Sequence, residues 1–95
     1  MRSLADIRKE IDAIDDEIVG LMGKRFALAP EVVSRKMADG VSPVVNARVA
    51  EVINRNVVHA ARAGVPPKII ETLYTNIIDA MHDIEARMMA EKATK

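Results

Sequence analysis

The chain has 95 residues with 14 basic and 14 acidic side chains, a formal net charge of zero, and no cysteine. The length limits it to one domain, and the balanced charge argues against a nucleic-acid binder. Without thiols, disulfides and thiolate metal sites are excluded.

Apolar residues make up 49% of the sequence and aromatic residues only 2%. A core must therefore be built from aliphatic side chains, a composition that suits helices. No apolar run approaches the ~20 residues of a membrane span, and the N-terminus lacks the apolar segment of a signal peptide. We expect a cytoplasmic protein that binds neither nucleic acid nor membrane.

The first predicted helix covers residues 4–37. Ser3 is its expected N-cap, and Asp6, three residues later, is the expected capping-box partner. Apolar residues recur along this helix at alternating spacings of three and four, which forms a heptad seam. The seam consists of Leu4, Ile7, Ile11, Ile14, Ile18, Leu21, Leu28 and Val32. Position 25 belongs to the same series, but it is occupied by Arg25.

Pro30 lies inside this pattern and removes a backbone hydrogen bond, so we expect a kink between Phe26 and Pro30, not a full break. A helix of ~33 residues is ~50 Å long, whereas a compact domain of this size has a radius of gyration of only ~12 Å. Two shorter helices cannot cover such a rod, so its seam needs a second copy of the chain. We predict an antiparallel, intertwined homodimer; a monomeric bundle broken at Pro30 is the alternative.

The second predicted helix covers residues 44–63. A loop over residues 37–41 precedes it, with Gly40 as its turn residue. Ser42 is the expected N-cap and Pro43 the first helical residue.

The third predicted helix covers residues 67–91. Gly64 stops the helix before it, and Pro67 starts this one. Its apolar face consists of Ile70, Leu73, Ile77, Met81, Ile84 and Met88. The predicted fold class is all-α, a single domain over residues 1–95 with three helices, the first of them long.

Arg25 and Lys36 are the first candidate ligand-binding residues. A guanidinium in an apolar seam is costly unless it is paired, and the nearest downstream acid, Glu31, lies six residues away. Arg25 therefore reaches solvent, pairs with an acid on another helix, or binds an anion. Lys36 follows eleven residues later, which returns it within about 20° of the same helix face, ~16 Å away. A small anionic ligand fits between the two side chains. Taken alone, Lys36 would be interpreted as an ordinary solvated lysine.

Arg8 and Arg48 extend this basic set. Arg8 lies ~25 Å from Arg25 along one helix, so it reaches the same ligand only from the partner chain of an antiparallel dimer. A solvent-exposed arginine is the alternative. Arg48 stands near a helix N-terminus, where the macrodipole disfavours a cation, which hints at a functional reason. A surface pairing with Glu51 or Asp39 is equally open.

Other kinds of site find no support in the sequence. His59 and His82 lack metal-ligand spacing and are interpreted as structural or surface residues. No serine has a local histidine and acid, and there is no glycine-rich phosphate loop. We expect no metal and no cofactor, so any chemistry must depend on positioning and electrostatics.

Several stretches together resemble the all-helical chorismate mutase family, including its isochorismate-pyruvate lyase branch. They are residues 4–15, with the pattern L-x-x-I-R-x-x-I-D-x-I-D, then residues 21–25, Lys36, Arg48 and residues 73–78. The likeness covers nearly the whole chain. It implies an intertwined dimer of three-helix chains with two active sites, acting in the shikimate pathway and aromatic amino acid biosynthesis.

The resemblance also implies the chemistry. Chorismate, a small dicarboxylate, rearranges to prephenate when its ether C–O bond breaks and a C–C bond forms, without cofactor or covalent intermediate. Arg25 and the partner's Arg8 would hold the carboxylates, and Lys36 would face the ether oxygen, where negative charge develops. Arg48 would complete the positive pocket.

The chain departs from the family at two positions of the second helix. Val45 and Val49 stand where the mutases often carry an Asp and a Glu that accept hydrogen bonds from the ring hydroxyl. Such apolar residues also resemble the lyase branch, which converts isochorismate to salicylate and pyruvate. The mutase is the preferred interpretation. A non-catalytic helical dimerisation module is the third alternative, but such a module has no need of the four basic residues.

In the third helix, Glu85 stands where the family often has a Gln near the ether oxygen. A glutamate donates a hydrogen bond only when protonated, so we expect activity to fall as pH rises. Otherwise Glu85 is a surface acid paired with Arg87 or Lys92. Met81, one turn earlier, joins Val45 and Val49 as an expected substrate contact.

Overall fold

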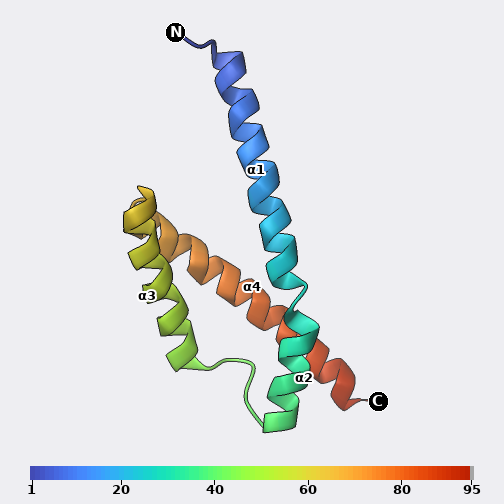
Figure 1. Ribbon diagram of the computed structural model, residues 1–95. Coiled ribbons are helices and arrows are strands. Elements are labelled where there is room, and N and C mark those ends of the chain that lie inside the picture. Colours follow the sequence, from blue (N-terminus) through green and yellow to red (C-terminus); the bar gives the residue numbers. More distant parts are fainter. Residues whose placement is uncertain (95) are drawn as a thin grey trace.

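The computed structural model describes residues 1–94, which contain four helices and no strand. The helices are α1 (Leu4–Phe26), α2 (Ala29–Asp39), α3 (Asn46–Ala63) and α4 (Pro67–Ala93). The all-α fold class is confirmed, with α1 and α2 forming the two parts of the long first helix (Figure 1). None of the helices in residues 1–94 combines the length and apolar character needed to cross a bilayer.

The long helix bends at Ala27 and Leu28. Both residues keep right-handed helical dihedral angles, and the Leu28 N–H donates to the Arg25 carbonyl at 3.2 Å. Pro30 lies in the first turn of α2, where its missing N–H leaves no intrahelical bond unmade. The kink expected between Phe26 and Pro30 is therefore confirmed.

Local signals explain most helix ends. The Ser3 hydroxyl accepts a hydrogen bond from the Asp6 N–H at 3.1 Å, so the predicted N-cap of α1 is present. Gly40 and Gly64 follow α2 and α3 with φ of 66° and 78°, the left-handed conformation that glycine adopts without a steric penalty.

The start of α3 differs from the prediction. Asn46 is the first residue of α3 and the extended Val45 is its N-cap, so the expectation that Ser42 and Pro43 begin this helix is wrong. The Ser42 hydroxyl instead accepts a local hydrogen bond from the Val44 N–H at 3.4 Å. The Pro43 carbonyl accepts a bond from α2, which holds this segment in the connection between the helices.

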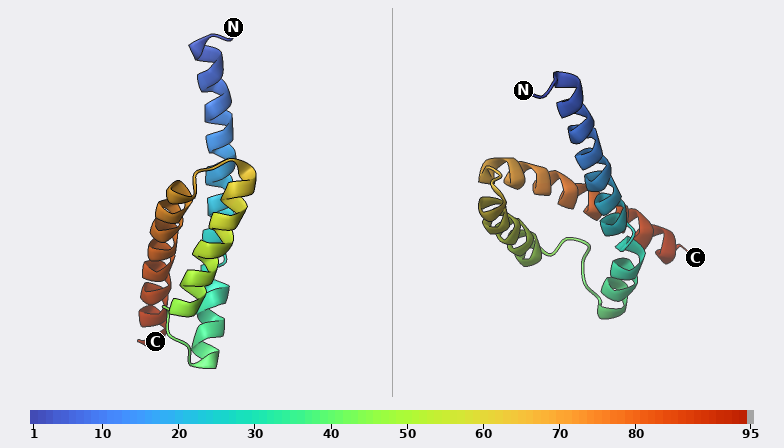
Figure 2. Two further views of the ribbon diagram at one scale, coloured as in Figure 1. Left: turned by 90° about the vertical axis from the view of Figure 1, so that its left-hand side faces the viewer. Right: turned by 45° about the horizontal axis from the view of Figure 1, so that its top comes forward.

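The body of the molecule consists of α4 with α2 and α3 packed against it (Figures 1 and 2). Its buried apolar residues are Ala29, Val33, Ala60, Ile78 and Met81, and one charged residue, Glu85, is buried with them. The small side chains of Ala29 and Ala60 let these helices approach closely. The core is thus aliphatic, as the composition predicted, and it is small for a chain of this length.

Helix α1 has no buried residue and projects away from this body (Figures 1 and 2). Its apolar seam faces outward, with Ile14 51% and Leu21 63% exposed. The radius of gyration is 17.0 Å and the long dimension 60 Å, against ~12 Å expected for a compact domain of this length. A single chain therefore leaves the seam of α1 uncovered.

Candidate active site

A cavity of about 340 Å³ lies at the kink of the long helix, between α2, α3 and α4. Its ionisable lining residues are Arg25, Lys36, Arg48, His82 and Glu85, and its apolar ones are Leu28, Val32, Val49, Val52, Ile78 and Met81. This volume is that of a small-molecule site, and apolar walls with a few convergent charges are typical of such sites.

Arg25 and Lys36 both line this cavity, as their spacing of eleven residues predicts. The bend between them does not separate them because the residues at the bend keep helical dihedral angles. Arg25 is half-buried, and no ion pair of its guanidinium is found within residues 1–94. A half-buried cation without an acid partner is an attractive position for an anionic ligand.

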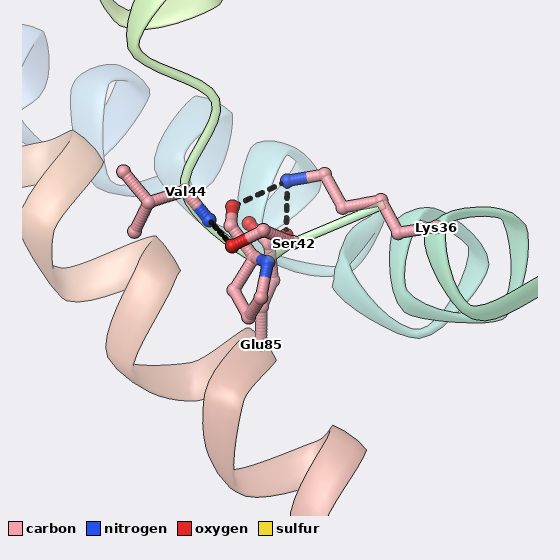
Figure 3. A network of polar contacts seen from close by, with 5 residues as sticks. Lys36, Ser42, Val44 and Glu85 are labelled. Carbon is pink, nitrogen blue, oxygen red and sulfur yellow. Dashed lines mark hydrogen bonds and ion pairs between the residues drawn. The ribbon is translucent and has the colours of Figure 1, made fainter. Parts of the chain in front are cut away.

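Lys36 connects three parts of the chain at the cavity wall. Its ammonium group donates to Glu85 Oε1 at 2.7 Å and to the Pro43 carbonyl at 2.7 Å (Figure 3). The side chains of Lys36 and Glu85 are only 21% and 4% exposed. Lys36 is therefore not the solvated lysine that the sequence allowed, and the pair places one positive and one negative group side by side in the cavity.

Glu85 is not the surface acid that the sequence left as an alternative. It is buried on α4 and pairs with Lys36, while Lys92 donates to the Ser34 hydroxyl at 2.8 Å. A buried carboxylate is costly to maintain without a partner, so Lys36 stabilises it here.

Arg48 reaches the cavity from the first turn of α3. Its guanidinium also forms an exposed ion pair with Glu51, one of the two surface partners that the sequence allowed; the other, Asp39, pairs with Arg35 at 3.0 Å. Exposed ion pairs contribute little to stability. Arg48 can therefore leave Glu51 for a ligand at small cost.

Val49 and Met81 line the cavity, but two other predicted site residues do not. Val45 is half-buried, and its backbone caps α3. Arg8 is exposed on α1, away from the cavity of its own chain, which agrees with the distance along the helix computed from the sequence.

The sequence model described as chorismate mutase type II matches residues 7–86, most of the chain. The chain belongs to the chorismate mutase type II family. Membership supports chorismate mutase activity at the level of the family and confirms the resemblance carried by the basic residues and the opening helix. Comparisons with curated proteins and with solved structures gave no match.

In this member of the chorismate mutase type II family, the cavity includes residues that the sequence analysis did not assign to it. They are Leu28, Val32, Val52, Ile78 and His82. His82, interpreted from the sequence as a structural or surface residue, is half-buried and lines the cavity. The signal that could have placed it is its position four residues after Ile78 and three before Glu85, on one face of α4.

Proposed function

We propose that this protein is a chorismate mutase that rearranges chorismate to prephenate in the cavity between α2, α3 and α4. The observation that carries the proposal is the convergence of Arg25, Lys36 and Arg48 on one cavity with apolar walls. These three cations come from α1, α2 and α3, and no acid other than Glu85 lines the cavity within residues 1–94.

The reaction breaks the ether C–O bond and forms a C–C bond within one molecule, so no proton or electron enters or leaves. Its barrier is lowered by holding the substrate folded and by stabilising the charge that develops on the ether oxygen. Guanidinium groups suit the first task because they bind carboxylates through two parallel hydrogen bonds. The ammonium of Lys36 suits the second, and the apolar walls strengthen both interactions by excluding water.

The proposed active unit is a homodimer in which Arg8 completes the partner's cavity. The uncovered seam of α1 supports the dimer, because an apolar stripe of this length is normally buried. In an antiparallel arrangement, the first turns of one α1 approach the kink of the other, which brings Arg8 near the partner's cavity. The same packing of α1 against its copy would then bury the apolar seam and bring the partner's Arg8 to a substrate carboxylate.

Sedimentation should show a species of about 21 kDa, twice the 10.4 kDa of one chain. Because five buried apolar residues form a small core, folding should depend on association, and the thermal midpoint should rise with protein concentration. A 10 kDa species with a midpoint independent of concentration would contradict the dimer.

The carboxylate of Glu85 places a negative charge in the cavity beside Lys36. Glu85→Gln replaces it with an amide that can donate a hydrogen bond to the ether oxygen. This variant should therefore raise kcat on chorismate about tenfold, the worth of one hydrogen bond. Asp83→Asn, an exposed change on the same helix, is the matched control and should leave kcat unchanged. A Glu85→Gln enzyme no faster than the wild type would contradict a donor role at this position.

The lyase is the second candidate function. It is favoured by the position of the apolar Val49 on the cavity wall. The Val49 side chain cannot accept a hydrogen bond, and isochorismate carries its ring hydroxyl elsewhere on the ring than chorismate does. Incubation with each compound separately decides between the two: prephenate from chorismate supports the mutase, and salicylate with pyruvate from isochorismate supports the lyase. A folded protein that forms neither product would leave the non-catalytic dimerisation module.

A further inference from the structure

His82 is the one polar side chain of the cavity wall to which the proposed reaction gives no task. It lies on α4 between Ile78 and Glu85, at spacings of four and three, so all three side chains share one helix face. The residue is half-buried, and no hydrogen bond or ion pair of its imidazole is found within residues 1–94. Its ring nitrogens are therefore available to a ligand in the cavity.

When the polar groups of the substrate are matched with the side chains of the cavity, one of these groups has no hydrogen-bond partner. Its two carboxylates match the guanidinium groups of Arg25, Arg48 and the arginine proposed to come from the second chain. Its ether oxygen matches Lys36 and Glu85. The remaining polar group is the ring hydroxyl, and a hydroxyl buried without a hydrogen bond loses much of its binding free energy.

The wall formed by α3 cannot supply that partner. Beyond Arg48, its cavity residues are Val49 and Val52, which have no polar side-chain atom. The α2 side contributes Val32, and the kink contributes Leu28, which are equally apolar. On α4, the imidazole of His82 both donates and accepts, which matches the two capacities of a hydroxyl.

We propose that His82 hydrogen-bonds the ring hydroxyl of the bound substrate and thereby determines which ring isomer the cavity accepts. This inference rests on the proposed function, since it assigns the recognition of a substrate of that class. The imidazole is short, with two side-chain torsions, so its reach is limited, and we expect it to favour a hydroxyl at one ring position over the neighbouring one. A site that hydrogen-bonds a substrate hydroxyl discriminates strongly against a compound lacking that group at that place.

The test compares the wild type, His82→Leu and His82→Gln with chorismate and with isochorismate as separate substrates. His82→Leu should raise KM for the preferred isomer about tenfold with little change in kcat, because the bond is made before and during the reaction alike. The ratio of kcat/KM between the isomers should move toward one. His82→Gln, which keeps a donor and an acceptor at similar reach, should recover most of the preference. His59→Leu, the exposed histidine on α3, is the matched control.

A second measurement uses only the wild-type protein, so it does not depend on the folding of any variant. A chorismate analogue with hydrogen in place of the ring hydroxyl should inhibit competitively about tenfold more weakly than its hydroxylated counterpart. Equal inhibition by both, or an isomer ratio unchanged in His82→Leu, would overturn the role of His82 while leaving the proposed function standing. A wild type that converts neither isomer would overturn both.

Discussion

Replacing Lys36 by Gln is expected to lower kcat about 100- to 1000-fold, because losing one electrostatic donor at a developing negative charge typically costs ~3–4 kcal/mol of barrier. The ammonium group lies at the cavity wall beside Glu85. In the proposed reaction it interacts most strongly with the ether oxygen when the C–O bond breaks and negative charge develops there. KM should change little, since this interaction strengthens in the transition state. Steady-state kinetics on chorismate measure both quantities.

Lys36 also holds the structure together, so its structural and catalytic roles must be separated. Removing it leaves the buried carboxylate of Glu85 unpaired, which should lower the thermal midpoint of Lys36→Gln. The double variant Lys36→Gln/Glu85→Gln removes that charge and should recover stability without recovering activity. Recovery of both together would mean that Lys36 acts through the fold alone.

Arg35→Gln is the matched control for Lys36→Gln. Arg35 is the neighbouring cation on α2, with a side chain 78% exposed and paired to Asp39. Because exposed ion pairs are worth ~1 kcal/mol or less, this change should leave kcat within about twofold of the wild type. A Lys36→Gln enzyme that also stays within that range would contradict the assignment of Lys36.

The sequence predicted those parts of the fold that depend on local chemistry. Ser3, Gly40 and Gly64 stand at helix ends because their side-chain or backbone properties satisfy groups nearby in the chain. Ser42 has the same capping chemistry, yet α3 begins four residues later. The bond from Lys36 to the Pro43 carbonyl is made across the fold, and no local rule could reveal it.

In the site, too, the features set by local helix geometry were predictable, whereas the contacts between helices were not. Helical geometry placed Arg25 and Lys36 on one face and Arg8 out of reach, because residues on one helix have a fixed angular relation. The pairing of Lys36 with Glu85 joins α2 to α4 through two residues that are 49 positions apart in the sequence. Periodicity shows that each helix has an apolar face but not which faces meet, so helix geometry alone could not predict this pair. The family resemblance placed both residues near the ether oxygen but did not indicate that they pair with each other.

The division of the site between two chains should appear when two inactive variants are mixed. Arg8→Ala and Arg25→Ala should each lower kcat/KM by about 100-fold or more, because each removes a cation proposed to hold a substrate carboxylate. Within one chain, Arg8 is exposed on α1 and Arg25 lines the cavity. If Arg8 serves the partner's cavity, the two substitutions fall in the same site of a mixed dimer and leave its other site intact.

Equal amounts of the two variants, unfolded together and refolded, should therefore recover about one quarter of the wild-type activity, since half of the dimers are mixed and each has one complete site of two. Mixing Arg25→Ala with Lys36→Gln is the matched control. Both of these residues line the cavity of one chain, so every site of that mixture lacks one of them and activity should stay low. Without recovery in the first mixture, Arg8 does not act across the dimer.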